Sequence, residues 1–218
     1  MSTTETTATE QGHWYDAKTG EPRYTLIGKN GKERATKITD AKLHGWAPSV
    51  TTITKVMAAP GLENWKQDQI LHAALTLPRI AGETEQDFAK RVKADAKAQG
   101  IAAAARGTAL HGSIEQHIHG KTVTPEHFNH VNKVEIELEK VGIPLLHGKA
   151  EHSFAHPAGY GGKVDAHGDG WVVDFKTKDK IDPDKTLAWD EHVIQLAMYA
   201  HGLGIEAPRC LNVFVGID

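Results

Sequence analysis

Two aspartates and a lysine flank a short turn, and their types and spacing suit acid–base or metal chemistry. The dipeptide Asp169-Gly170 predicts a two-residue type I′ turn, because both central positions of that turn need φ > 0. Counting outward from this turn places Asp165 directly opposite Asp174, and side-chain alternation puts Lys176 on the same face as Asp174. The segment therefore predicts two carboxylates and an amine on one face of a β-hairpin.

This predicted face has two interpretations. Two carboxylates directly across an antiparallel ladder repel each other. A bound cation would remove that penalty, and hard oxygen ligands suit Mg²⁺ or Mn²⁺. A lysine beside them can orient or deprotonate a water molecule and stabilise developing negative charge. The other interpretation is a solvated face held by an ordinary ion pair, and the hairpin alone does not choose between the two.

An alanine-rich segment contributes a second pair of candidate ligands. His111 and Glu115 are four residues apart and would share one face of a helix. Gly107 and Gly112 would each weaken this helix by about 1 kcal/mol relative to alanine, a cost that close packing at the glycines would explain. An imidazole and a carboxylate can contribute to a metal site, but this spacing is also common in surface ion pairs.

Gln195 and Tyr199 are also four residues apart, in a segment with helical periodicity. On one helix face they can line a polar groove and contact phosphates or bases. The alternative is an ordinary amphipathic helix. Its buried stripe would consist of Val193, Leu196, Ala197 and Ala200.

Composition excludes several classes of protein. The chain has 218 residues and a formal net charge of −3, so no overall positive charge indicates a nucleic-acid binder. Cys210 is the only cysteine, which excludes a disulfide framework, a cysteine-ligated zinc site and an iron–sulfur cluster. No apolar run reaches membrane-spanning length and the polar N-terminus has no signal-peptide core, so we expect a cytoplasmic protein.

The pattern of elements predicts an α/β (α+β) fold with an antiparallel hairpin at its centre. Residues 1–12 are expected to be a disordered tail and 13–218 a single domain. Within this domain, 13–47 would form a β arm, 48–142 a helical region and 143–218 the core. The basic residues of the arm are Lys29, Lys32, Arg34, Lys37 and Lys42.

The expected elements follow from periodicity and from turn and capping residues. Strands are expected at 14–15, 24–27, 37–39, 149–156, 162–167, 171–177 and 211–215. Helices are expected after an N-cap at Ser49 or Thr51, and at 63–77, 85–99, 101–119, 125–141 and 187–203. Gly100 would separate two of these helices, and Thr84 would cap the first of the two.

The order of the motifs resembles the PD-(D/E)xK nuclease superfamily, and within it the RecB-like branch of phage-type exonucleases. The motifs are Gly107-Thr108-x-x-His111, Asp165-x₈-Asp174-x-Lys176 and Gln195-x-x-x-Tyr199. The segment Pro48-Ser49-Val50-Thr51-Thr52, followed by Pro60-Gly61-Leu62 and Trp65, is also similar to the start of phage members. The resemblance implies a restriction-endonuclease-like core: a central mixed sheet that contains the active-site hairpin, flanked by helices, with an N-terminal helical region.

The resemblance also implies a role for each matching residue. One or two Mg²⁺ or Mn²⁺ ions would be bound by His111, Asp165, Asp174 and the carbonyl of Phe175. Lys176 would be the catalytic lysine, together with the metal-binding aspartates and Glu115; Glu151 lies at a further position where family members carry acids. Substrate-binding positions would be Ser49, Thr51, Thr177, Lys178, Gln195 and Tyr199, with Lys180 and the basic arm as further phosphate contacts.

The function implied by the resemblance is metal-dependent hydrolysis of linear DNA, single- or double-stranded, by an exonuclease. Such an enzyme would act in phage or bacterial recombination, repair or DNA processing, in the cytoplasm of a bacterial host. It would have a recombination or single-strand-binding protein as a possible partner, and no membrane association. Two alternatives stay open: a nuclease-fold DNA-binding module without turnover, and a nuclease that acts on RNA.

Overall fold

The computed structural model describes residues 13–57, 60–182, 184–185 and 187–217, so the predicted tail at 1–12 lies outside the described residues. The chain divides into two compact units, one made of Met1–Met57 with Leu110–Asp218 and the other of Ala58–Ala109. The second unit falls within the helical region predicted for 48–142. No helix in the described ranges combines the length and apolar character needed to cross a membrane.

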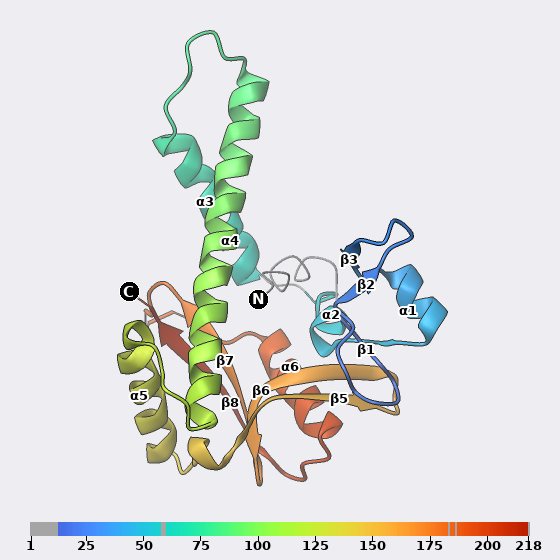
Figure 1. Cartoon of the computed structure of the whole chain (residues 1–218). Helices are drawn as coiled ribbons and strands as arrows, with labels where there is room; N and C mark the ends of the chain where they lie inside the picture. Colours follow the sequence, from blue (N-terminus) through green and yellow to red (C-terminus); the bar gives the residue numbers. More distant parts are fainter. Residues whose placement is uncertain (1–12, 58–59, 183, 186, 218) are drawn as a thin grey trace. The chain divides into compact units, whose positions relative to one another are not determined.

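A four-stranded mixed sheet forms the centre of the first unit (Figure 1). Its strands are β5 (Lys149–His156), β6 (Tyr160–Gly168), β7 (Trp171–Lys178) and β8 (Arg209–Gly216), in that spatial order. The pairs β5–β6 and β6–β7 are antiparallel, whereas β7 and β8 are parallel and are connected through α6 (Asp190–Gly202). The prediction of a mixed α and β fold with a central antiparallel hairpin is confirmed.

Helices cover both faces of this sheet. On one face, Leu110, Ile114 and Ile118 of α4 (Glu85–Ile118) and the apolar side of α5 (Pro125–Lys140) pack against Val173 and Phe175. On the other face, α6 and the short helix α2 (Val50–Thr54) pack against Val164 and Val172. Figure 1 shows α5 and α6 on opposite sides of the strands. The short 3₁₀ helix η2 (Leu145–His147) leads into β5.

Two small sheets precede this core. The strands β1 (Trp14–Tyr15) and β4 (Ala47–Pro48) pair with each other, and so do β2 (Thr25–Ile27) and β3 (Glu33–Ala35). The strand predicted at 37–39 is wrong, because α1 (Ile38–His44) begins there. The carboxylate of Asp40 accepts the backbone N–H of Lys37 at 2.8 Å and binds Arg34 through two hydrogen bonds. This local cap favours a helical turn over an extended strand.

The second unit contains α3 (Pro60–Thr76) and most of α4. The predicted helix break at Gly100 is wrong, since α4 runs without interruption from Glu85 to Ile118. Alanine-rich flanks outweigh one glycine, and a Cβ at Gly100 would lie 3.7 Å from the ring of Trp65. Thr84 does cap α4, because its hydroxyl accepts the N–H of Asp87 at 3.1 Å.

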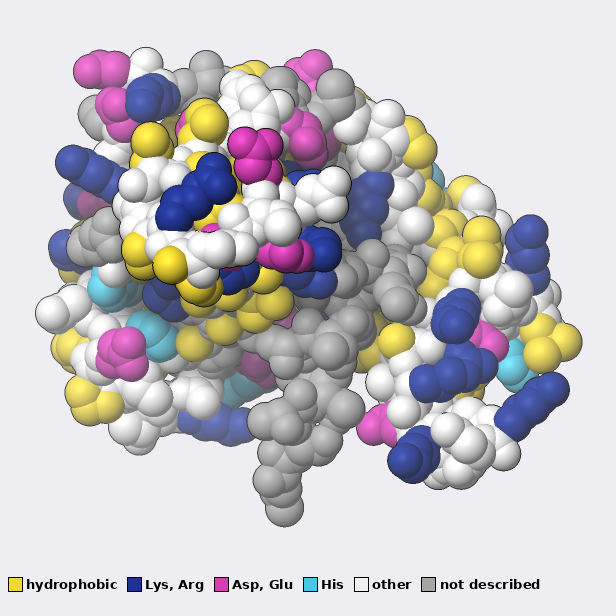
Figure 2. Space-filling view, turned by 90° about the horizontal axis from the view of Figure 1, so that it is seen from above, with side chains coloured by type: hydrophobic (Ala, Val, Ile, Leu, Met, Phe, Trp, Pro, Cys, Tyr) yellow, Lys and Arg dark blue, Asp and Glu magenta, His cyan; other side chains and the backbone are white. Residues whose placement is uncertain are grey.

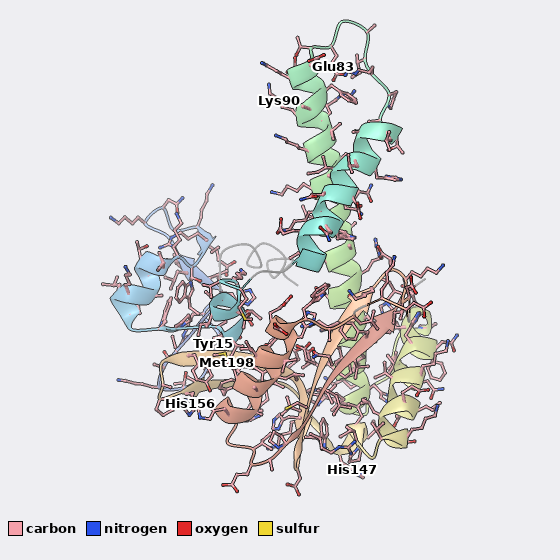
Figure 3. The ribbon with its side chains drawn as sticks, turned by 180° about the vertical axis from the view of Figure 1, so that it is seen from behind. Tyr15, Glu83, Lys90, His147, His156 and Met198 are labelled. Carbon is pink, nitrogen blue, oxygen red and sulfur yellow. The ribbon has the colours of Figure 1, made fainter. Side chains whose placement is uncertain are left out.

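The core of the second unit is small. Ala73, Val92 and Ala96 are its buried apolar residues, with Leu77 and Phe88 packed against them. Periodicity predicts an apolar stripe on the 63–77 helix made of Trp65, Ile70, Leu71, Ala74 and Leu75. This prediction is wrong in part, since Leu71 and Leu75 are exposed. The guanidinium of Arg91 binds Glu83 at 2.6 Å and also donates to the carbonyl of Pro78; Figure 3 labels Glu83 in the loop between α3 and α4.

The hairpin β5–β6 touches the N-terminal strands where β6 begins. A Cβ at Gly161 would lie 2.6 Å from Cβ of Tyr15 and 2.8 Å from the carbonyl oxygen of Phe154. Ser49 forms a single parallel bridge with the same glycine. The carbonyl oxygen of Phe154 belongs to the backbone and cannot rotate away, so only glycine fits at position 161. Tyr15 is labelled in Figure 3.

We expect Gly161→Ala to destabilise the protein by about 1–3 kcal/mol, through overpacking against backbone. The matched control is Gly112→Ala in α4, where the new methyl group meets no described atom within 4 Å apart from the adjacent backbone of its own helix. This control should instead stabilise by up to about 1 kcal/mol through helix propensity. Urea unfolding of both variants measures the difference, and equal effects would contradict the packing described for Gly161.

A pair of imidazoles links β5 and β6, with His167 buried and His152 exposed. His152 Nδ1 and His167 Nε2 share a hydrogen bond of 2.6 Å between β5 and β6. Burial, the proximity of His152 and the charge of Lys149 lower the pKa of His167 to about 4. The folded state therefore excludes a proton that the unfolded state binds below about pH 6.5.

The free energy of unfolding should fall as the pH decreases from about 6.5 to 4, by about 2 kcal/mol in total from His167. Above about pH 6.5 His167 is neutral in both states and contributes no pH dependence. We expect His167→Gln to flatten this part of the pH profile. Chemical unfolding at several pH values tests this, and identical slopes for wild type and His167→Gln would contradict it.

Candidate active site

The β6–β7 ladder ends one pair before the two aspartates. Its register pairs Gly168 with Trp171 and Ala166 with Val173, which confirms the hairpin predicted at Asp169-Gly170. The next pair would be Asp165 with Asp174, but no backbone pairing is formed there. The two carboxylates thus lie where the hairpin opens, and the direct cross-strand pairing predicted for them is wrong.

The pairing of β5 with β6 is also interrupted at Asp165. Ala150 pairs with Ala166 and His152 pairs with Val164, but Glu151 and Asp165 between them do not pair. Glu151 has φ of 52°, a left-handed conformation that is uncommon outside glycine. On β6, Val164 packs in the core between the sheet and α6, whereas Ala166 packs in the core between the sheet and α4 with α5. Residues two apart on a strand normally share a face. The strand therefore changes face at Asp165.

The side chain of Asp165 replaces the missing ladder contacts. Its Oδ2 accepts the backbone N–H of Phe175 at 2.7 Å and lies 3.6 Å from Nδ1 of His111. Burial alone would raise the pKa of Asp165, but His111, the Phe175 N–H and the charge of Lys176 together lower it below its ordinary value. Burial alone would lower the pKa of His111, but Asp165 and Asp174 raise it. His111 and Asp165 thus form an ion pair beside the hairpin.

Asp174 is the most deeply buried carboxylate of the site, with 3% of its surface exposed. Burial and the nearby charge of Asp165 raise its pKa to about 6, although Lys176 acts in the opposite direction. Its Oδ2 lies 2.6 Å from Nζ of Lys176 but accepts no well-directed hydrogen bond from any described residue. The contact of this oxygen with Lys176 is therefore mainly one of opposite charges.

Lys176 is held from the other side by α6. Its ammonium group donates to Oε1 of Gln195 at 3.1 Å, and Nε2 of Gln195 donates to the hydroxyl of Tyr199 at 2.9 Å. Gln195 and Tyr199 are buried, so they do not line an open groove as predicted. The predicted stripe on this helix is also wrong in part, since Val193 and Ala197 are exposed.

Glu151 and Glu115, the two further acids predicted for the site, lie at the edge of this cluster. Glu151 binds Lys163, and burial together with the charges of Asp165 and Glu115 raises the pKa of Glu151. The carboxylate of Glu115 lies 3.8 Å from His119, so its partner is His119 and not His111. Glu115 therefore contributes to the local field without a direct contact to the aspartates.

Lys163 is a residue of the cluster that sequence reasoning left without a role. It lies two positions before Asp165 on the same strand and pairs with Glu151 on the neighbouring strand. Side-chain alternation along the strand places Lys163 on the same face as Asp165. The contact of Lys163 with Glu151 could not be predicted, because no local pattern indicates the irregular backbone at Glu151.

The remaining predicted substrate contacts lie on surrounding elements. The Ser49 hydroxyl caps α2 by accepting the N–H of Thr52 at 3.0 Å and also bonds the Thr51 hydroxyl. Thr177 and Lys178 continue β7, and the Lys178 ammonium lies 5.6 Å from the centre of the Phe214 ring. Lys180 is exposed. Contact of these residues with a substrate stays a prediction.

The donor set fits a divalent cation by its chemistry. His111, Asp165 and Asp174 offer an imidazole and two carboxylates, and Oδ2 of Asp174 accepts no well-directed hydrogen bond although Lys176 lies beside it. In the side-chain positions of the described residues, however, no three such groups converge closely enough to hold a metal ion. Binding would therefore need small side-chain shifts, with the contact between Lys176 and Asp174 as the first to change.

Comparison with known proteins adds no family: no family model, curated protein or solved structure matches this chain.

We expect Asp174→Ala to weaken Mn²⁺ binding by at least about 10-fold, because a carboxylate ligand is lost and even the loss of a residue that only supports a ligand costs that much. The control Asp169→Asn removes a carboxylate from the turn of the same hairpin and keeps a residue suited to a type I′ turn. Isothermal titration with Mn²⁺ measures both affinities. Undiminished affinity in Asp174→Ala would contradict the assignment of Asp174 as a ligand.

Proposed function

We propose that this chain is a metal-dependent deoxyribonuclease of the PD-(D/E)xK superfamily, in its RecB-like branch, and that it acts as an exonuclease on linear DNA. The observation that carries the proposal is the group formed by buried Asp174, half-buried Lys176 and buried Gln195, placed beside Asp165 at the opening of the hairpin. Two like-charged carboxylates and a lysine, placed where the strand pairing is interrupted, destabilise the folded protein. Such local destabilisation is typical of a catalytic site. The mixed sheet is also compatible with a restriction-endonuclease-like core.

The proposed metal would be held by His111, Asp165, Asp174 and the carbonyl of Phe175. One or two Mg²⁺ or Mn²⁺ ions bound there would supply Lewis-acid activation of the phosphate and a lower pKa for the attacking water. The N–H of Phe175 orients Asp165, and Asp165 in turn orients His111.

Lys176 has the central role among the residues of this chain. The amide of Gln195 holds its ammonium group, and Tyr199 holds the amide, so the charge is positioned before substrate arrives. In the proposed reaction the oxygen of water attacks phosphorus and gives up a proton to solvent, and the bond from phosphorus to the 3′-oxygen breaks. The departing 3′-oxygen takes up a proton from solvent, so that one water molecule is consumed in total. The products are a 5′-phosphate and a 3′-hydroxyl, and Lys176 offsets the charge that develops on the phosphoryl oxygens.

DNA would be held near the site mainly through its phosphates. Lys178 and Lys180 follow the catalytic lysine on and after β7, on the strand that carries Asp174. Phosphate contacts of this kind carry no base specificity and weaken with salt. The site therefore favours digestion without sequence preference.

We expect Lys176→Ala to lower DNA cleavage by at least about 100-fold while Mn²⁺ affinity is retained, because the lysine acts on charge in the transition state and is not itself a ligand. The assay is degradation of end-labelled linear single- and double-stranded DNA with Mn²⁺, with Mg²⁺ and with EDTA. The control Lys133→Ala removes an exposed lysine from α5 and should cleave like the wild type.

Retained cleavage in Lys176→Ala would remove this lysine from the mechanism. A folded wild-type protein that binds Mn²⁺ and DNA but degrades neither strand form would instead indicate a nuclease-fold binding module. Degradation of RNA alone would indicate the RNA-directed alternative.

A further inference from the structure

A second feature, formed by the N-terminal arm, lies outside the proposed catalytic group. It is an open groove of about 550 Å³, bounded by α1 and the strands β1 and β4. Its walls are mostly apolar and include Trp14, Ile38, Ala41, Trp46 and Pro48, with Lys42 as the charged residue of the lining. We call this feature the arm groove.

Positive charge surrounds the arm groove. Residues 13–47 hold seven lysines and arginines against four acids, although the whole chain has a net charge of −3. Lys18 and Lys37 are exposed next to two lining residues, Ala17 and Ile38, and Lys42 is exposed in the groove itself. Figure 2 shows dark blue side chains gathered over this part of the molecule, at the right of the view.

The acids of the arm do not neutralise these lysines. Asp16 and Glu21 both bind Arg23, and Asp40 binds Arg34. Glu33 accepts a hydrogen bond from the hydroxyl of Thr25. Within the described residues, the lysines at the groove have no carboxylate within ion-pair distance. Their charge is therefore available to an external anion.

The apolar part of the groove is also unusually open. Ile38 is 57% exposed and Leu43, on the same helix, is 78% exposed. The ring of His44 stacks on Trp46, with 4.8 Å between the ring centres. Apolar side chains that stay exposed beside a concave surface are typical of a binding site.

The chemistry of the walls separates two kinds of anionic partner. A nucleic acid would use the lysines, but bases in this groove would bring polar edges against apolar walls that offer few hydrogen bonds. Trp14 is buried and Trp46 is already stacked by His44, so neither indole presents two free faces to bases. A peptide with apolar side chains flanked by acids matches both the walls and the rim.

We propose that the arm groove binds an acidic segment of a protein partner, with one or two apolar side chains of that segment inserted between α1 and β4. The acidic residues of the segment face Lys18, Lys37 and Lys42. This proposal does not depend on the nuclease proposal, because it uses none of the hairpin residues and no metal. It assigns the lysines of the arm to a protein partner, in place of the phosphate contacts implied by the family resemblance.

The test uses the full chain and a fluorescein-labelled peptide in which a leucine and a phenylalanine follow a run of aspartates. We expect saturable binding by fluorescence anisotropy, which weakens as salt is raised. Ile38→Asp combined with Lys42→Glu should weaken binding by at least about tenfold, through lost apolar burial and reversed charge. Lys42→Glu alone should weaken it by a smaller factor, and thermal unfolding verifies that each variant is folded.

Two matched controls define specificity. Lys133→Glu reverses an exposed charge on α5 and should bind like the wild type. A peptide with serine in place of its leucine and phenylalanine should bind much more weakly. No binding by the wild type, or equal binding by wild type and the folded groove variants, would overturn the proposal. Displacement of the peptide by labelled single-stranded oligothymidine that needs the same groove residues would assign the groove to DNA.

Discussion

Repulsion between Asp165 and Asp174 is the constraint around which the first unit is organised. A regular hairpin would place these carboxylates directly opposite each other in a buried sheet, and the ladder opens at that position instead. Each carboxylate then finds a different partner. Asp165 takes a backbone N–H and His111, whereas Asp174 takes Lys176, which itself depends on Gln195.

The opening is tolerated because the surrounding sheet is well supported. The eight-residue parallel pairing of β7 with β8 holds the strand that carries Asp174 and Lys176 on its other edge. Two separate apolar cores cover the two faces, so the change of face at Asp165 leaves apolar residues buried on both sides of it. The irregular position at Asp165 is therefore surrounded by regular strand pairing and by buried apolar side chains, which together hold it in place.

Much of the fold could be predicted from sequence, because many of its signals are local. The Asp169-Gly170 turn sets the register of the hairpin, and β-branched and aromatic residues set the strands around it. Thr84 and Ser49 identify two helix starts through capping. Errors arose where tertiary contacts or longer context decide the outcome: Gly100 lies inside α4, and the Arg34–Asp40 pair makes 37–39 the start of a helix.

The candidate site was predictable in its members and less so in its contacts. Lys176, Asp174 and Asp165 do lie together, but Gln195 and Tyr199 face inward to Lys176, because the depth of a helical residue depends on how the helix packs. The left-handed Glu151 and its pair with Lys163 have no local signature.

Anomalous diffraction at the manganese edge, from crystals soaked in Mn²⁺, tests the central assignment most directly. We expect density in contact with the carboxylates of Asp165 and Asp174 and with His111, and a Lys176 amine that has moved from Asp174. Absence of that density in a protein that degrades DNA with Mn²⁺ would contradict it.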